Sequence, residues 1–288
     1  MPRLFCFGLG YSPSHLAESL HAEGWTIAGT SRSEEGCATL AAQGFEAHVF
    51  HGAAPLADPG VLDGVTHLLT AVPPDEAGDP VLAHHSAHIT TIETLSWAGY
   101  LSATSVYGDT GGAWVDETAS CQPSTERGQR RVAAEAEWLA LCHEDRFPVH
   151  VFRLAGIYGP GRSVLDQVRA GTARRIDRPD HLFSRIHVDD IVAVLRASMA
   201  RPNAGAIYNL CDDTPAPSAD VTSHGCELLG IEPPPLVAFD DAGLSPMARS
   251  FYADNRLVRN DRIKSELGVT LKHPDYRSGL RAILAAEG

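Results

Sequence analysis

Two glycines near the start of the chain, Gly8 and Gly10, have the spacing of a phosphate-binding turn. The apolar run 4–7 before them predicts a strand, and the pattern from Ser14 onward predicts a helix. Glycines at such a junction let the backbone turn sharply and approach a pyrophosphate, which then rests against the N–H groups of the helix N-terminus. The residues expected to bind a dinucleotide here are Gly8, Gly10, Tyr11 and Ser12.

Pro13 stands where the usual fingerprint has its third glycine. Proline fits the first turn of a helix because its missing N–H would have no helical partner, and Ser12 is the expected N-cap. An ordinary strand–turn–helix that holds no ligand is the alternative interpretation.

A second group of candidate residues follows the predicted strand 25–30. Ser31, Arg32 and Ser33 would lie where the adenosine ribose of a dinucleotide is bound. An acidic residue there accepts bonds from a free 2′-hydroxyl, whereas an arginine accommodates a 2′-phosphate. Because the strand end carries no Asp or Glu, the sequence favours NADP over NAD, with a solvated Arg32 as the alternative.

The apolar run 65–72 predicts a parallel strand that is buried on both faces. It stops before two prolines, so Ala71, Val72 and Pro73 are expected to lie along the cofactor. A helix over 82–97 and a strand over 100–106 are predicted next.

Two histidines of that predicted helix, His84 and His88, are four residues apart on one face. Zinc sites need three or four ligands, so surface histidines are the favoured interpretation and no metal is expected. Farther on, Asp189 or Asp190 is expected to cap a helix over 191–199 and to help dock the C-terminal lobe.

Strands and helices alternate as far as about residue 160. This order predicts an α/β fold with a doubly wound, mainly parallel Rossmann sheet and a smaller C-terminal substrate-facing lobe. The expected dinucleotide-binding domain spans 1–162, with 187–212 returning to it, and the lobe spans 163–288, where proline and glycine interrupt the pattern repeatedly.

Bulk properties narrow the classes of partner. The formal charge of −13 argues against a general nucleic-acid or anionic-membrane binder, since those need basic surfaces. No apolar run approaches the roughly 20 residues needed to span a bilayer, and no signal peptide is recognised. Six cysteines scattered without a C-x-x-C pair predict thiols in a reducing cytoplasm.

Taken together, the motifs resemble those of the extended short-chain dehydrogenase/reductase superfamily, the NAD(P)-dependent epimerase/dehydratase family. The segments that carry the resemblance are 102–108, 116–118 with Pro123, 153–161, 185–190, 208–210 and 255–280. The resemblance implies that Ala103, Arg131 and Tyr158 contact the cofactor. It also implies a homodimer formed through the helices expected at 82–97 and 124–142.

The catalytic positions depart from that family. Its Ser/Thr, Tyr and Lys fall on Ala103, Arg127 and Arg131 of this chain. Arginine keeps its proton near neutral pH, so Arg127 is a poor general acid or base, whereas Arg131 can still donate to a ribose hydroxyl. Thr104 is a replacement hydroxyl, although strand alternation sends it to the opposite face from Ala103.

Arg127 and Arg131 would lie on one helix face, where two guanidinium groups can clamp a carboxylate or phosphate. A solvated basic edge is the alternative. We therefore expect Thr104, Arg127 and Arg131 to be the catalytic residues of an oxidoreductase, isomerase or lyase acting on a small anionic or sugar-nucleotide-like substrate. A dinucleotide-binding sensor or regulatory protein without turnover is the alternative function.

Overall fold

The computed structural model describes residues 1–287, apart from the side chains of Asp145 and Met247. The chain forms two compact units. The first unit comprises Met1–Ala103, Glu126–Arg153 and Val194–Tyr208, and the second comprises Thr104–Thr125, Leu154–Ala193 and Asn209–Gly288. These units do not follow the expected boundary at residue 162, and the domain limits stay a prediction.

A seven-stranded sheet forms the centre of the first unit, in the order β11-β7-β5-β4-β1-β2-β3. Its strands are β1 (Arg3–Phe7), β2 (Thr26–Ser31), β3 (Glu46–Val49), β4 (His67–Thr70), β5 (Trp97–Ala103), β7 (Val149–Leu154) and β11 (Ile207–Leu210). The pairs that β1 forms with β2 and β4 are parallel. From β1 the chain continues to β2 and β3 on one side, and it then crosses to β4 on the other side of β1. In α/β sheets of this type, ligands bind at the carboxyl ends of the strands where the order reverses in this way, here between β1 and β4. The predicted doubly wound Rossmann fold is confirmed.

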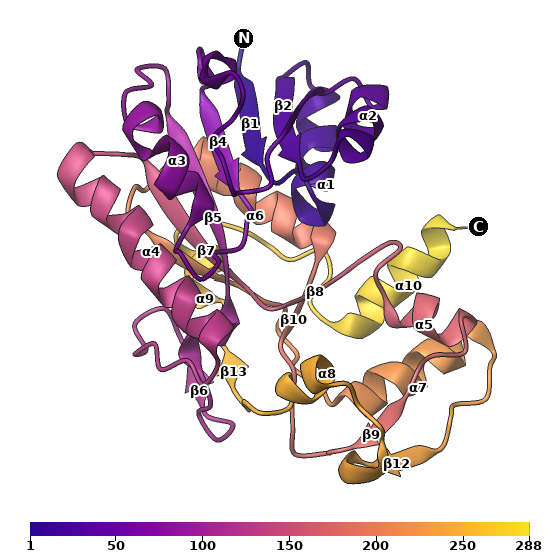
Figure 1. Ribbon diagram of the computed structural model, residues 1–288. Helices are drawn as coiled ribbons and strands as arrows, with labels where there is room; N and C mark the ends of the chain where they lie inside the picture. The colour runs from indigo at the N-terminus through magenta and orange to yellow at the C-terminus, as the bar shows by residue number, and fades with distance from the viewer. Residues whose placement is uncertain (288) are drawn as a thin grey trace. The chain divides into compact units, whose positions relative to one another are not determined.

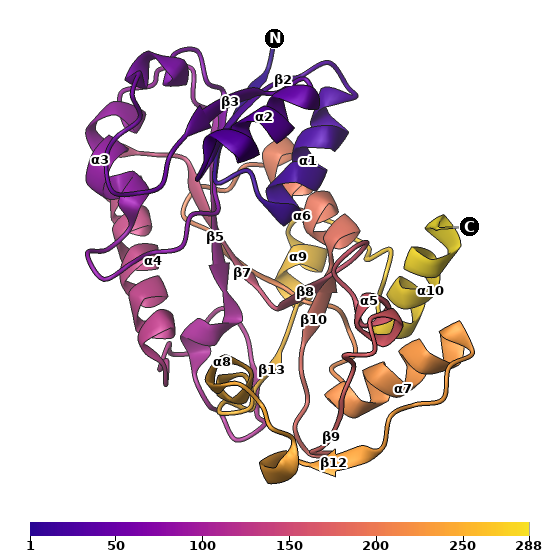
Figure 2. The same ribbon diagram turned by 45° about the vertical axis from the view of Figure 1, so that its right-hand side comes forward.

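Helices cover both faces of this sheet: α3 (Pro80–Ile89) and α4 (Glu126–Asp145) lie on one face, and α1 (Tyr11–His21), α2 (Glu34–Ala42) and α6 (Val188–Ala200) on the other (Figures 1 and 2). The core under α3 and α4 includes Phe7, Tyr100 and Trp138. Every residue of β7 is buried, as expected of a parallel strand covered by helices on both sides.

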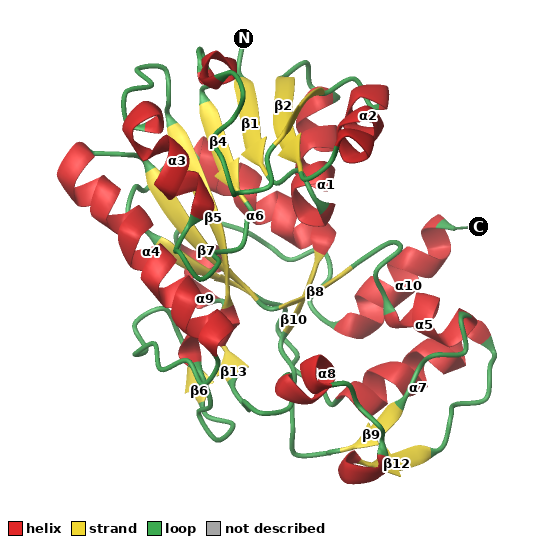
Figure 3. Ribbon diagram, in the orientation of Figure 1, coloured by secondary structure: helices red, strands yellow, loops and turns green. Residues whose placement is uncertain are grey.

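The second unit combines short strands with helices, coloured by type in Figure 3. Its strands are β6 (Trp114–Val115), β8 (Gly156–Tyr158), β9 (Arg175–Asp177), β10 (Arg185–His187), β12 (Leu236–Ala238) and β13 (Leu257–Val258). They pair in parallel as β8–β10, β9–β12 and β6–β13. Its helices are α5 (Val164–Arg169), α7 (Ser218–Leu229), α8 (Pro246–Ser250), α9 (Asp261–Ser265) and α10 (Tyr276–Ala286). Tyr158, Leu165, Val221 and Leu280 are among the residues of its core.

Three element boundaries differ from the prediction. The helix α1 begins at Tyr11 rather than Ser14, and Gly10, not Ser12, is its N-cap. The helix expected over 82–97 ends at Ile89, because the hydroxyls of Thr90 and Thr91 bond back to helix carbonyls and the backbone then turns into β5.

The strand expected over 100–106 ends at Ala103, and Thr104–Tyr107 form a 3₁₀ turn. Within the described residues, no helix is both long and apolar enough to cross a membrane.

Candidate dinucleotide site

The turn after β1 depends on Gly8, whose φ of +78° disfavours other residues. Its N–H donates to Thr30 Oγ1 at 2.8 Å, which ties the turn to the end of β2. A Cβ atom on Gly8 would lie 3.3 Å from Val72 Cγ2 and 3.4 Å from the carbonyl carbon of Ala71. The structure therefore brings together Gly8, Ala71 and Val72, which the sequence analysis assigned to one site.

Gly10 opens α1 in an extended conformation, and a Cβ atom there would meet nothing within 4 Å. Space for a ligand thus lies beside the helix N-terminus, whose first turn contains no acidic residue. Two residues later, Ser12 is buried and its Oγ has no hydrogen-bond partner among the described residues. Buried hydroxyls rarely lack a partner, so a bound phosphate or ribose oxygen is a fitting one.

The end of β2 presents Arg32 to solvent, and the structure records no hydrogen bond or ion pair for it within residues 1–287. Ser33 caps α2 by accepting a bond from the Gly36 N–H at 3.2 Å. The Ser31 side chain packs against Gly36 so closely that a Cβ atom on Gly36 would collide with the Ser31 Oγ. Arg32 is therefore the residue of this segment that can reach a ligand freely.

The first turns of α4 carry Arg127 and Arg131, the two arginines predicted to stand at the positions of the resembling family's Tyr and Lys. Arg127 is exposed, whereas Arg131 Nη1 donates to the Leu101 carbonyl at 3.0 Å and so holds α4 against β5. The charge of Arg131 also acts on two buried groups: burial raises the pKa of the Tyr100 phenol and of the Asp79 carboxyl, and the guanidinium opposes both shifts. Arg131 is thus an anchored cation, and Arg127 is an exposed one on the same helix face.

A buried polar network that the sequence does not predict lies next to Arg131. Arg153 on β7 donates to both carboxylate oxygens of Glu135, with Nη2 to Oε2 at 2.7 Å, and the Ser102 hydroxyl donates to Oε1. The side chains of Arg153 and Glu135 are 5% and 4% exposed. The only sequence signal was an acidic residue four positions after Arg131 on the buried stripe of a helix.

Two predicted site residues belong to the second unit, Thr104 and Tyr158. Thr104 is buried in the turn after β5. The Tyr158 hydroxyl donates to the Asp275 carbonyl at 3.3 Å, and α10 approaches the ring so closely that a Cβ atom on Gly279 would collide with it. Burial raises the pKa of this phenol. Its hydroxyl therefore holds the start of α10, and its expected contact with the cofactor stays a prediction.

The histidines of α3 bind separate partners. His84 Nε2 donates to the Gly52 carbonyl at 3.0 Å, and His88 Nε2 lies 3.6 Å from the Asp63 carboxylate.

The capping role expected of Asp189 or Asp190 is wrong, because α6 begins at Val188 and both lie inside its first turn. Asp190 instead accepts the N–H groups of Lys272 and His273, which is a docking contact within the second unit.

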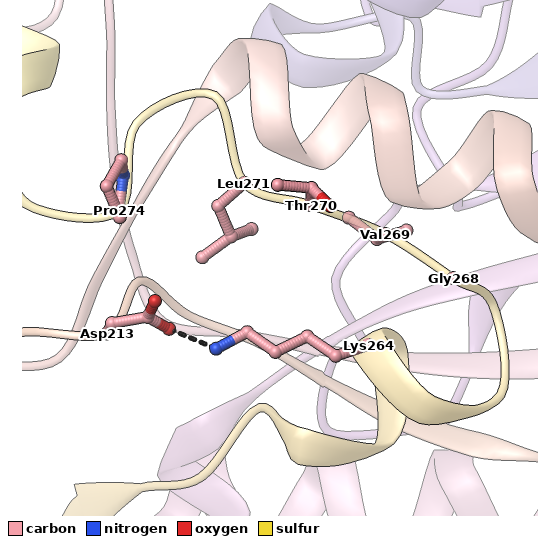
Figure 4. A pocket seen from close by; sticks show the side chains of 7 residues that line it. All are labelled: Asp213, Lys264, Gly268, Val269, Thr270, Leu271 and Pro274. Carbon is pink, nitrogen blue, oxygen red and sulfur yellow. Dashed lines mark hydrogen bonds and ion pairs between the residues drawn. The ribbon is translucent and has the colours of Figure 1, made fainter.

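One pocket of the second unit, of about 470 Å³, contains none of the predicted site residues (Figure 4). Its lining residues are Asp213, Lys264, Gly268, Val269, Thr270, Leu271 and Pro274.

Comparison with known proteins agrees with this geometry. A model of the NAD dependent epimerase/dehydratase family matches residues 8–211, from the first glycine of the turn to the end of the sheet. The chain belongs to this family. A structure of a functionally unknown conserved protein from Silicibacter pomeroyi DSS is similar to it, with 51% identity, a TM-score of 0.92 and coverage of 99% of each chain.

Protein YeeZ of Escherichia coli K12 is 28% identical over 96% of this chain and 97% of its own length. The structure of dTDP-glucose 4,6-dehydratase from Bacillus anthracis, in complex with NAD, shares the fold. Its TM-score is 0.78 at 15% identity, over 99% of this chain and 96% of that one.

Proposed function

We propose that the first unit binds NADP at the Gly8–Gly10 turn, with NAD as the alternative cofactor. The observation that carries the proposal is the N-terminus of α1, where space is open beside Gly10 and the buried hydroxyl of Ser12 has no partner among residues 1–287. Backbone N–H groups at a helix start favour a pyrophosphate, and the hydroxyl gains a partner when one binds. Ala71, Val72 and Pro73 at the end of β4 would line the same turn.

The preference for NADP rests on Arg32. This exposed guanidinium follows β2 directly and can pair bidentately with a 2′-phosphate. Ser31 and Ser33 flank it, and Glu34 and Glu35 begin α2 next to it. Those two carboxylates disfavour an anion, so Arg32 must supply most of the attraction for the 2′-phosphate.

We further propose that the protein is an oxidoreductase or an isomerase/lyase acting on a small anionic or sugar-nucleotide-like substrate. The bound cofactor supplies a hydride donor or acceptor. Arg127, a permanent cation, would stabilise negative charge that develops on a substrate oxygen, but it would not exchange a proton. Arg131 can direct N–H groups not bonded to Leu101 at the cofactor ribose. Thr104 would supply the hydroxyl that Ala103 lacks.

A second candidate function is a sensor that binds the dinucleotide without turnover. The replacement of the family's tyrosine and lysine by Arg127 and Arg131 favours it, since no phenol remains at the position of the proton-transfer group.

The test begins with a fluorescence titration of the full chain with NADPH and with NADH. A panel of nucleotide sugars and keto acids is then assayed for turnover with the preferred cofactor. Turnover of any member supports the enzyme, and tight binding without turnover supports the sensor. Failure to bind either dinucleotide overturns both proposals.

Two further expectations belong with this proposal. A homodimer would pair through α3 and α4, and light scattering of the purified chain measures its mass directly. The acidic surface and the scattered cysteines support a cytoplasmic protein that binds small molecules rather than nucleic acid or membranes.

A further inference from the structure

Two imidazoles and a carboxylate meet at the start of α6, within the second unit. His187 ends β10, Asp189 lies in the first turn of α6, and His273 comes from the segment before α10. Their candidate ligand atoms all lie within 4.8 Å of one another. His273 Nε2 lies 3.2 Å from Asp189 Oδ2, and His187 Nδ1 lies 3.9 Å from the same oxygen.

These separations suit a small divalent ion. Zinc bonds to histidine nitrogen and carboxylate oxygen at about 2.0–2.2 Å, so neighbouring ligands of a tetrahedral site lie roughly 3.3–3.5 Å apart. The two distances to Asp189 lie on either side of that range, and since the three ligand atoms lie within 4.8 Å of one another, a small inward shift of the imidazoles would complete the site. The imidazoles are almost fully buried, with 3% and 4% of their side chains exposed, whereas the Asp189 side chain is 38% exposed. An ion could therefore enter from the carboxylate side and keep a water molecule as its fourth ligand.

The backbone already holds the three residues in place. Asp190, fully buried, accepts the N–H of Lys272 at 2.6 Å and that of His273 at 3.0 Å, which fixes the segment before α10. The Asp189 N–H donates to His187 Nδ1 at 3.1 Å. An ion bound at that nitrogen would replace this bond, and at His273 it would replace the proton that Nε2 shares with Asp189.

The Lys272 ammonium would compete with a metal ion for the Asp189 carboxylate. This ammonium lies 2.7 Å from Asp189 Oδ2, the oxygen that both imidazoles approach, and the Lys272 side chain is 70% exposed. A cation of the chain itself thus occupies the open side of the carboxylate. Because an exposed lysine leaves such a pair at little cost, a divalent ion can displace it.

We propose that His187, Asp189 and His273 form a zinc site that cross-links the segment before α10 to the start of α6. Imidazole nitrogens select zinc over magnesium and calcium, which prefer oxygen ligands. None of these three residues belongs to the dinucleotide turn, so the zinc site can be tested separately from the proposed function.

The experiment titrates EDTA-treated full-length protein with ZnCl2 by calorimetry, in a non-thiol reductant, and follows Co²⁺ binding by its visible absorption. The wild type is expected to bind one ion with tetrahedral cobalt bands, undisturbed by excess Mg²⁺. Asp189→Asn and His273→Ala are expected to weaken binding by more than about tenfold, since each removes a direct ligand.

Lys272→Ala supplies the decisive variant, because it removes the competing cation from a side chain that is mostly exposed. It is expected to bind zinc about two- to fivefold more tightly, which is the worth of an exposed ion pair. Lys264→Ala is the matched control: Lys264 pairs with Asp213 at 2.6 Å in the same unit, as drawn in Figure 4, and its removal should leave the affinity unchanged.

Two results would overturn the site. One is the absence of zinc binding in both the wild type and Lys272→Ala. The other is binding that persists at full strength in Asp189→Asn and His273→Ala, which would place the ion on cysteines or other histidines. Circular dichroism of each variant establishes that a loss of binding is not a loss of fold.

Discussion

At the scale of single residues, the proposed preference for NADP rests on Arg32. Arg32→Ala is expected to weaken NADPH binding by about 10- to 100-fold, because a charge-assisted bidentate contact with a phosphate is worth a few kcal/mol. NADH lacks the 2′-phosphate and should lose little. Fluorescence titration of both cofactors measures the two affinities. Arg169→Ala, which removes an exposed arginine paired with Glu287, is the control. Equal losses for NADPH and NADH would refute the 2′-phosphate contact.

Gly8 can be tested by comparison with another glycine of similar backbone conformation. The φ of Gly8 is +78° and that of Gly24 is +87°, but only Gly8 is crowded, by Val72 and the backbone of Ala71. Alanine at either position should cost about 1 kcal/mol in backbone strain, measured by urea unfolding. Gly8→Ala should in addition abolish most dinucleotide binding, whereas Gly24→Ala should leave it intact. Equal dinucleotide binding by the two variants would show that the turn at Gly8 does not contact the dinucleotide.

At the scale of elements, α4 is held to the sheet by a buried ion pair. Glu135→Gln leaves the Arg153 guanidinium buried without a countercharge, and such a change costs about 3–5 kcal/mol of unfolding free energy. Glu126→Gln in the same helix removes an exposed partner of Arg130 and should cost at most about 0.5 kcal/mol. Urea denaturation measures both. A Glu135→Gln variant as stable as Glu126→Gln would show that the pair adds nothing to the packing of α4.

The sheet elements were predictable because their signal is local. Apolar runs such as 65–72 and the glycines after β1 identify buried strands and a tight turn without knowledge of their neighbours. The ends of elements were less predictable: α3 stops at Ile89 because threonine hydroxyls bond back to the helix, although the apolar pattern continues. The contact between Glu135 and Arg153 joins residues on different elements, and the His187–Asp189–His273 cluster spans more than eighty positions. Neither pairing can be seen in the spacing of residues.

At the scale of the whole molecule, the charge is strongly negative at neutral pH, and acidification acts differently on different buried groups. Burial raises the pKa of Asp212 in the second unit to about 8. Such a carboxyl binds its proton more strongly in the folded state, so its contribution favours folding more as the pH falls from about 8 towards 4. Buried histidines of the first unit have the opposite effect.

His85 shows how acidification changes the stability of the first unit. Burial lowers its pKa from 6.5 to about 4, and its Nε2 accepts the Leu56 N–H at 3.2 Å, which requires the neutral ring. Above pH 6.5 the ring is neutral in both states and contributes nothing. Between pH 6.5 and 4 only the unfolded chain gains the proton, so stability falls, by about 1–2 kcal/mol at pH 5 for this residue. Burial lowers the pKa of His150 as well, which adds to the effect.

These histidines should therefore lower the urea concentration at which the first unit unfolds at pH 5 relative to pH 7.5, against the opposite contribution of Asp79, whose pKa is raised by burial. Tryptophan fluorescence reports mainly on this unit, because three of the four tryptophans, Trp25, Trp97 and Trp138, belong to it. His85→Asn keeps an acceptor for the Leu56 N–H and cannot titrate, so the difference in midpoint between the two pH values should shrink. His143→Gln, at an exposed position of α4, should behave like the wild type. If His85→Asn loses as much stability on acidification as the wild type does, protonation of this ring is not what destabilises the first unit.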